Sequence, residues 1–142
     1  MPRDLHNHIH PVRGVSPVAT AGDNTAIVSQ IIDRQGFNAL EFLIACGAIP
    51  DADATYTCLV EHDDVIGFGT AVAVPDEELL GLESQASFIF SDDNKIFKIG
   101  YVGYKQFVRV TLTPANNTGA TLICIIAVLA EPKFLPTANP PA

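Results

Sequence analysis

Residues 106–113 read QFVRVTLT, the most regular alternation of apolar and polar side chains in the chain. Successive side chains of an extended strand point to opposite faces. Val108, Val110 and Leu112 would therefore point together into a core, while the polar side chains between them would face solvent. This alternation predicts a β-strand with one covered face and one wet face.

The same signals recur along the chain between turns rich in Gly, Pro, Asn and Asp. One short helical turn is predicted over residues 74–81, because Pro75 and the following acids suit a helix start. Strands are predicted at 25–33, 37–46, 54–62, 85–90, 95–102, 106–113 and 120–130. Many short strands with almost no helix predict an all-β, antiparallel β-sandwich, with a jelly-roll-like topology preferred.

The last predicted strand differs from the others. Residues 120–130 read ATLICIIAVLA and are apolar at alternate positions on both sides. A strand of this kind is either central in a covered sheet or covered by a neighbouring subunit.

Both ends carry extensions punctuated by proline. We predict an N-terminal arm over residues 1–22, a sandwich domain over 23–130 and a Pro-rich C-terminal arm over 131–142, which holds four prolines in twelve residues. Arms of this kind can lie on a neighbouring chain. The partner-interface residues expected on them are His6, His8, His10, Val12, Phe134 and Leu135.

The segment DLHNHIH, residues 4–10, resembles the Asp-x-His-x-His start of barrel metallohydrolases. Such barrels need about 250 residues, and this chain has 142, with His62 as its only other histidine. Pro11 also holds His10 in an extended conformation. We expect a docked or partner-binding arm, no catalytic residues, no cofactor and no dedicated metal site. Adventitious metal binding by the three histidines stays open.

Composition narrows the class further. Hydrophobic residues make up 48% of the chain and charged residues 17%, enough apolar material for a packed core. The net charge is −8 and the basic residues are scattered, which argues against nucleic-acid binding. The apolar runs are too short for a membrane helix, and no signal peptide is expected. Buried thiols are expected at Cys46, Cys58 and Cys124, and a core or rim position at His62.

Two long stretches resemble a known group of proteins. The first is TAIVSQIIDRQGFNALEFLIACGAIPDADATYTCLVEHDD and the second is DDNKIFKIGYVGYKQFVRVTLTPANNTGATLICIIAVLAEP. Together they are similar to the capsid decoration, or cement, proteins of tailed phages and prophages. The resemblance implies a jelly-roll virion protein, made in the bacterial host cytoplasm. It would bind the major capsid protein on the outer head surface as a homotrimer and stabilise the shell. The resemblance implies no active-site residue in this chain.

Three other functions compete with this one. The chain could be another phage structural part, such as a tail or head-completion protein. It could be a carbohydrate-binding β-sandwich module, although such modules usually expose aromatic platforms and this chain has no tryptophan and three tyrosines. An enzyme would need the histidines to converge with an acid in one pocket, and no nucleophile elbow or phosphate loop supports that. We therefore expect a non-enzyme.

Overall fold

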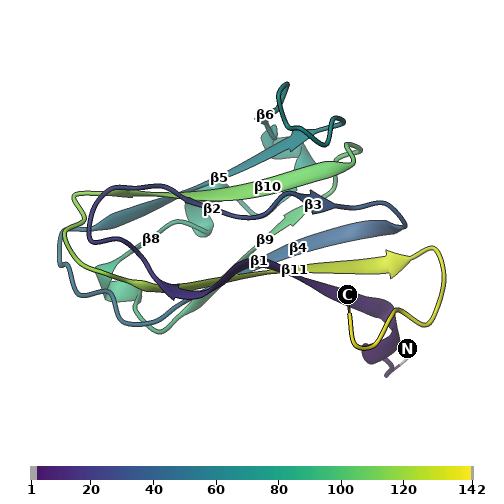
Figure 1. Cartoon of the computed structure of the whole chain (residues 1–142), viewed down its shortest axis with the longest axis horizontal. Helices are drawn as coiled ribbons and strands as arrows, with labels where there is room; N and C mark the ends of the chain where they lie inside the picture. Colours follow the sequence, from purple (N-terminus) through teal and green to yellow (C-terminus); the bar gives the residue numbers. More distant parts are fainter. Residues whose placement is uncertain (1–2, 142) are drawn as a thin grey trace.

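A computed structural model of the chain describes residues 3–141 and forms a sandwich of two antiparallel sheets (Figure 1). Met1, Pro2 and Ala142, which belong to the two predicted arms, lie outside the described residues. The strands are β1 (Ile9–Ala19), β2 (Ile27–Val28), β3 (Ile32–Asp33), β4 (Phe37–Cys46), β5 (Thr55–Asp63), β6 (Val72–Ala73), β7 (Leu79–Leu80), β8 (Phe88–Ile89), β9 (Ile96–Tyr101), β10 (Phe107–Ala115) and β11 (Leu122–Pro132). Short 3-10 helices are η1 (His6–His8), η2 (Asp76–Glu78), η3 (Glu83–Gln85) and η4 (Phe90–Asp92).

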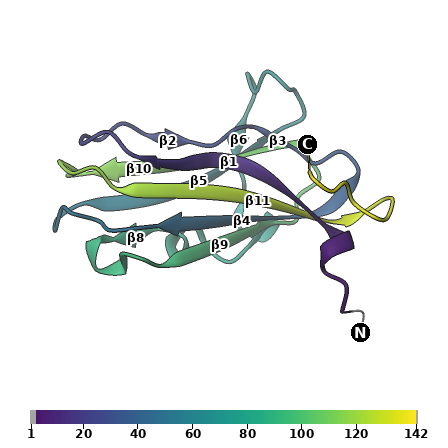
Figure 2. The same ribbon diagram turned by 60° about the horizontal axis from the view of Figure 1, so that its bottom comes forward.

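One sheet, here called sheet A, has the strand order β1-β11-β4-β9-β7. The other, sheet B, has the order β2-β10-β5-β6, with β3 also on β10 and β8 also on β5. Figure 2 looks onto sheet A and shows β1, β11, β4 and β9 side by side. Residues adjacent in a sheet are mostly distant in sequence, as in other sandwiches.

The core lies between the two sheets. The alternation predicted for β10 is confirmed, since Val108, Val110 and Leu112 are fully buried. Residues 37–46 form β4 as predicted, and its Phe42 and Ile44 are fully buried as well. The predicted fold class, an antiparallel and jelly-roll-like β-sandwich, is therefore confirmed.

The strand predicted over 25–33 is broken into β2 and β3. Ser29 interrupts it, because its Oγ accepts the hydrogen bond of Val110 N at 3.0 Å in place of a backbone carbonyl. The next residue then leaves sheet B, and Gln30 N donates to Gly14 O of β1 at 2.9 Å. This segment joins the two sheets along one edge.

The strand predicted over 85–90 is also shorter, because only Phe88 and Ile89 pair with β5. Side-chain hydrogen bonds stabilise a 3-10 turn just before it: Leu82 N donates to Gln85 Oε1 at 3.0 Å, and Ser87 Oγ donates to Glu83 O at 2.8 Å. The helical turn predicted over 74–81 is reduced to η2, Asp76–Glu78.

The structure differs from the predicted N-terminal arm. Residues 9–19 form β1, an edge strand that pairs with β11 from Ile9–Ala130 to Ala19–Leu122. Val12 and Val15 pack against the core. A Cβ at Gly14 would lie 2.8 Å from Ile125 Cγ2, so the chain passes close to β11 at that point. The extension predicted to reach a neighbour instead completes the chain's own sheet, because its apolar side chains fit that edge.

The C-terminal segment folds back as well. Beyond β11, Thr137 N donates to Asn7 O at 3.1 Å, and Thr137 Oγ1 donates to Ile9 O at 2.6 Å. Both termini therefore lie at one end of the sandwich, where residues 3–8 and 133–141 form a single lobe (Figure 1). We call it the terminal lobe.

Candidate functional site

The outer face of sheet A is the most distinctive surface of the molecule. The strand register places its outward side chains in rows that cross the sheet. One row runs Arg13, Ile126, Leu43, Lys98, and the next runs Pro11, Val128, Glu41, Gly100, Leu80. Cys124, Ala45 and Ile96 form a third row. Most of these side chains are apolar although none points into the core.

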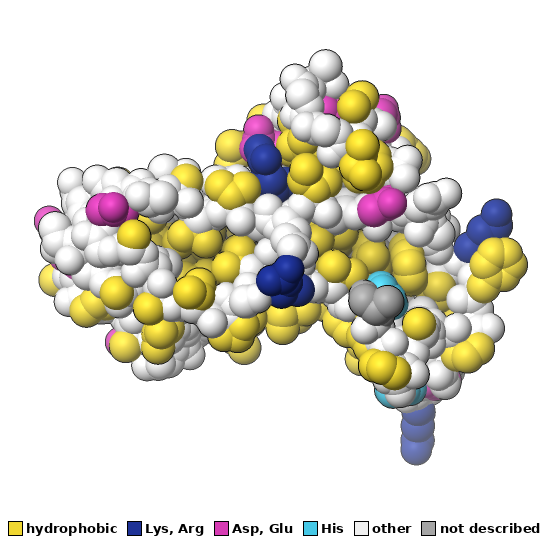
Figure 3. Space-filling view, in the orientation of Figure 1, with side chains coloured by type: hydrophobic (Ala, Val, Ile, Leu, Met, Phe, Trp, Pro, Cys, Tyr) yellow, Lys and Arg dark blue, Asp and Glu magenta, His cyan; other side chains and the backbone are white. Residues whose placement is uncertain are grey.

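Several of these apolar side chains are strongly exposed. Ile96 is 71% exposed, Leu80 59%, Leu122 54% and Ile126 40%. The space-filling view shows hydrophobic side chains along the edge where β1 and β11 run, with few charged ones among them (Figure 3). A contiguous apolar patch of this kind marks a contact site on a folded protein more often than single exposed residues do.

Two shallow grooves run across this face beside β1. One has a volume of about 380 Å³ and is lined by residues that include Pro17, Ala45 and Leu122. The other, of about 340 Å³, is lined by residues that include Pro11, Arg13 and Ile126. Their walls are mainly apolar, so they could accept side chains of another protein surface.

Charge on this face is sparse. Of the 16 Asp and Glu residues, Glu41 is the one that lies within the face in the described part of the chain, and Glu131 lies at its margin. The Glu41 carboxylate lies over Gly100 and accepts no hydrogen bond within residues 3–141. Loss of hydration raises the pKa of Glu41, and the nearby positive charge of Lys98 opposes this only in part. Glu41 is thus a half-buried acid without a bonded partner.

The three N-terminal histidines do not converge. His6 and His8 lie in η1, where His6 Nε2 meets Asn139 Nδ2 at 3.1 Å and His8 Nδ1 contacts Asp4 O at 2.5 Å. His10 stacks on the ring of Phe37 instead, with 5.4 Å between ring centroids. Within residues 3–141, no three or more His, Cys, Asp or Glu side chains are grouped to hold a metal ion.

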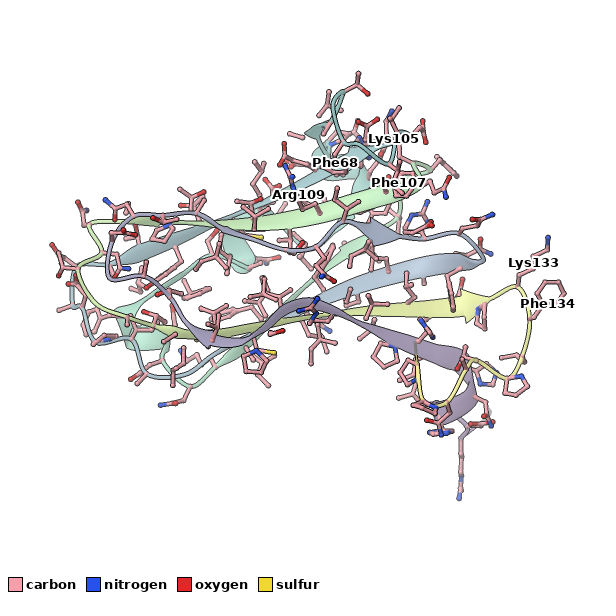
Figure 4. All side chains as sticks on the ribbon, viewed as in Figure 1. Phe68, Lys105, Phe107, Arg109, Lys133 and Phe134 are labelled. Carbon is pink, nitrogen blue, oxygen red and sulfur yellow. The ribbon has the colours of Figure 1, made fainter. Side chains whose placement is uncertain are left out.

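The predicted interface residues fall into two groups. Phe134 and Leu135 are 77% and 56% exposed in the terminal lobe, with Lys133 Nζ 5.7 Å from the Phe134 ring centroid (Figure 4). Val12 points toward the core, and His10 is engaged by Phe37. Val12 is therefore only partly exposed, because β1 turns it inward against the core.

His62 is buried between the sheets, as predicted from the apolar side of its strand. Its Nδ1 lies 2.8 Å from the hydroxyl of Tyr101 and 3.6 Å from Glu78 Oε2. Burial lowers the pKa of His62, and the negative charge of Glu78 opposes this. The Tyr101 hydroxyl also accepts the backbone N–H of Lys105 at 3.1 Å. The histidine is held in a structural network, with no serine, threonine or cysteine side chain hydrogen-bonded to it in the described residues.

The thiols are free, as predicted, and two of the three are buried. Burial, with the nearby charge of Glu83, raises the pKa of Cys58 to about 12, so this thiol is unreactive at neutral pH. The prediction was wrong for Cys124, which is partly exposed on the outer face of sheet A. Alternation along β11 turns it outward between Ile123 and Ile125.

A second surface feature lies in the loop between β9 and β10. Tyr104 is 95% exposed at its tip. The residues beside it are polar: Lys105 Nζ lies 3.6 Å from Asp64 Oδ2, and Gln106 Nε2 donates to Asp33 Oδ1 at 3.0 Å. An exposed aromatic ring next to paired polar groups is the kind of surface that can contact a polar ligand.

Sequence reasoning found part of the apolar face. The observation that residues 120–130 are apolar on both sides pointed to β11, which supplies Leu122, Cys124 and Ile126. It missed the contribution of β4, although its Leu43 and Ala45 alternate with buried residues in the same way. A search for strands that lack a polar side would have found both. In the described part of the chain, no helix is long and apolar enough to cross a membrane.

No protein-family model matches the chain, and no curated protein matches it. Among solved structures it is similar to the Clostridium thermocellum endo-1,4-beta-D-xylanase 10B CBM22-1-GH10 modules complexed with xylohexaose, at 10% identity and a TM-score of 0.42. That match covers 94% of this chain but 28% of the other. It is also similar to the xylan-binding module CBM15, at 9% identity and a TM-score of 0.38, over 92% of this chain and 95% of that one.

Proposed function

We propose that the protein is a non-catalytic structural protein that works by assembly, and that it serves as a capsid decoration protein of a tailed phage or prophage. The observation that carries the assembly role is the apolar outer face of sheet A. Burying one exposed leucine or isoleucine contributes about 1.5–3 kcal/mol. Ile96, Leu80, Leu122 and Ile126 lie on this one face, so a partner that covered it would be held firmly, after the entropy lost on association is subtracted.

The sequence resemblance supports the setting on a phage head. A decoration protein bridges shell subunits and so resists the internal pressure of packaged DNA. An oligomer that presents several copies of a weak contact to the shell gains binding strength through effective concentration. The net charge of −8 suits a protein outside the shell, away from DNA.

The terminal lobe is the surface we assign to the shell contact. Phe134 and Leu135 are exposed there, just beyond the end of β11. Two exposed apolar side chains next to Lys133 can insert into a pocket of a partner while the cation stays in water. This assignment places the shell contact on a surface other than the outer face of sheet A.

A second candidate function is carbohydrate binding, and the Tyr104 loop is the observation that favours it. A sugar ring could stack on the Tyr104 ring. The polar side chains beside it, Asp64 and Gln106, could then exchange hydrogen bonds with the sugar hydroxyls. One exposed ring offers a small platform, so this candidate ranks second.

The test uses heads of the phage that encodes the chain, assembled without it. The purified protein is added, and bound copies per head are measured together with the temperature at which the heads release DNA. We expect saturable binding and a higher release temperature. The double variant F134S/L135S should bind at least about tenfold more weakly, while the matched variant Y104S should bind like the wild type.

The opposite pattern would favour the second candidate. If the wild type leaves the heads bare, while it binds a polysaccharide on an affinity gel and Y104S does not, the decoration role is wrong. Loss of head binding in Y104S but not in F134S/L135S would contradict the assignment of the terminal lobe.

A further inference from the structure

We infer that the outer face of sheet A binds a second copy of the same face across a two-fold axis, with Glu41 of each copy against Lys98 of the other. This inference rests on the proposed assembly role and names the partner and the pairing. It follows from the unpaired acid, from the charge balance of the face and from the shape of the surface around the two residues.

The first observation is that the Glu41 carboxylate has no ion-pair or hydrogen-bond partner within residues 3–141. Its direct neighbours across the sheet are Val128 and Gly100, neither of which carries charge. Lys98 lies one row away, opposite Leu43, and forms no ion pair with Glu41. Covering Glu41 with an apolar partner would bury an unpaired charge, which is strongly unfavourable. A partner that brings a cation to Glu41 would remove this penalty.

The second observation is that the face carries that cation itself. Arg13 and Lys98 point outward from it, beside the single acid Glu41. The face is thus weakly positive on a chain with a net charge of −8. Two copies can approach through it while most of their acids stay on other surfaces, where salt screens them.

The third observation is the shape of the surface. Glu41 and Lys98 line the same shallow depression, of about 530 Å³, and its apolar walls include Leu80 and Ile96. A depression with both signs of charge can receive the same pair from a two-fold related copy. Each copy then supplies one acid and one base, which gives two reciprocal ion pairs bordered by aliphatic side chains.

Symmetry selects a pair over a ring. When one patch meets itself, the contact is isologous and closes with two copies, whereas a ring of three needs two different patches on each copy. The outer face of sheet A is a single patch. The homotrimer expected from the sequence resemblance would need a further patch, and we assign only the two-fold contact to this face.

The experiment compares E41K, K98E, the double variant E41K/K98E and an equimolar mixture of the two single variants, by sedimentation at several concentrations. Circular dichroism checks that each chain is folded, as expected for substitutions in a solvated face. The wild type should sediment as a pair of 15.2 kDa chains. Each single variant should associate at least about tenfold more weakly, because like charges then meet twice.

The mixture of the two single variants is the decisive measurement. An E41K chain presents only cations at these positions and a K98E chain only anions, so the two should form mixed pairs with two attractive contacts. The double variant should pair with itself. A ring of three cannot alternate two kinds of chain. If the wild type were a trimer, the double variant would therefore regain association, whereas the mixture of single variants would regain it poorly.

Three results would overturn the inference. The wild type could stay monomeric, or the single variants could associate like the wild type. The third is a mixture of single variants that does not associate although the double variant does. A trimeric wild type whose association is unaffected by the single substitutions would contradict this pairing but not the proposed assembly function. A monomeric wild type that also fails to bind heads would remove both.

Discussion

The two outer faces of the sandwich are built on similar strands and have opposite chemistry. The outward positions of β5 and β10 in sheet B hold Thr57, Thr111 and Thr113 and an ion pair, Glu61–Arg109, at 3.1 Å between Oε1 and Nη2. The outward positions of sheet A are mainly aliphatic. Threonine and isoleucine both favour strands, so the fold does not require apolar residues there. The difference is the one expected if sheet A meets protein and sheet B meets water, as the proposed assembly requires.

The acids on the two faces differ in the same way. Glu61 has Arg109 directly opposite it on the neighbouring strand, and the Arg109 guanidinium lies 4.6 Å from the ring centroid of Phe68 (Figure 4). Every group in that small cluster has a partner, except Arg109 Nε. Glu41 on sheet A has no such arrangement. In the assembly that we propose, the acid of sheet B is paired within the single chain, and sheet A is completed by a partner.

The largest effect is expected inside the sandwich, where two consecutive residues of β11 serve different faces. Ile125 is fully buried and Ile126 is 40% exposed on the outer face of sheet A. Ile125→Ala should lower the free energy of unfolding by about 3 kcal/mol, through lost burial and the cavity left behind. Ile126→Ala should lower it by less than about 0.5 kcal/mol. Urea denaturation of dilute protein measures both, and equal losses would show that Ile126 belongs to the core.

The next effect concerns association. Ile126→Asp places a charge in the middle of the apolar face and should weaken self-association at least about 100-fold, with little change in the stability of the single chain. Thr111→Asp makes the same kind of change on the outer face of sheet B and should leave association unchanged. Sedimentation at matched concentrations compares them. If Thr111→Asp were the disruptive change, the contact would lie on sheet B.

A smaller effect is expected from the paired charges of sheet B. Arg109→Ala removes the ion pair with Glu61 and the contact with Phe68, and should lower the free energy of unfolding by about 1 kcal/mol. Lys98→Ala on sheet A should change the free energy of unfolding by only a few tenths of a kcal/mol, because Lys98 forms no ion pair within residues 3–141. Thermal unfolding of dilute protein measures both, and a larger loss from Lys98→Ala would mean that sheet A is complete by itself.

The residues show why the fold was predictable and much of the site was not. Alternation identified β4, β5, β9, β10 and β11, because burial of one strand face is a local property of the sequence. It did not identify the break at Ser29, where a side-chain hydroxyl replaces a backbone acceptor, since that depends on contact with Val110. It also assigned residues 9–19 to an arm, because Pro11 and Pro17 mask a strand that lies at an edge, where proline is tolerated.

The candidate site was predictable only in part for a related reason. A strand that is apolar on both sides, as residues 120–130 are, predicts that its second face is covered but does not say by what. The row that joins Arg13, Ile126, Leu43 and Lys98 exists only after four strands pair in register. The histidines stood out in the sequence because of their spacing, yet η1 and the start of β1 point them in different directions.

The smallest effect tests the unpaired acid directly. The pKa of Glu41 is raised above its usual 4.5 mainly by loss of hydration, so the charged form is disfavoured in the folded chain. Glu41→Gln should therefore stabilise the dilute chain at pH 7 by about 0.5 kcal/mol, a small gain because solvent still reaches the carboxyl. As the pH falls, the folded wild type takes up its proton before the unfolded chain does. Wild-type stability then rises relative to the variant, and the difference should be gone below about pH 4.5.

The same substitution should act in the opposite direction at high concentration. If Glu41 meets a cation of a second copy, Glu41→Gln removes that contact and should weaken pairing at pH 7 while it stabilises the single chain. Glu61→Gln is the matched control: it should lower the stability of the single chain, because Glu61 has its partner within the chain, and leave pairing unchanged. A Glu41→Gln chain that is less stable when dilute would place the partner of Glu41 inside its own sheet, and the outer faces of sheets A and B would then differ in composition but not in completeness.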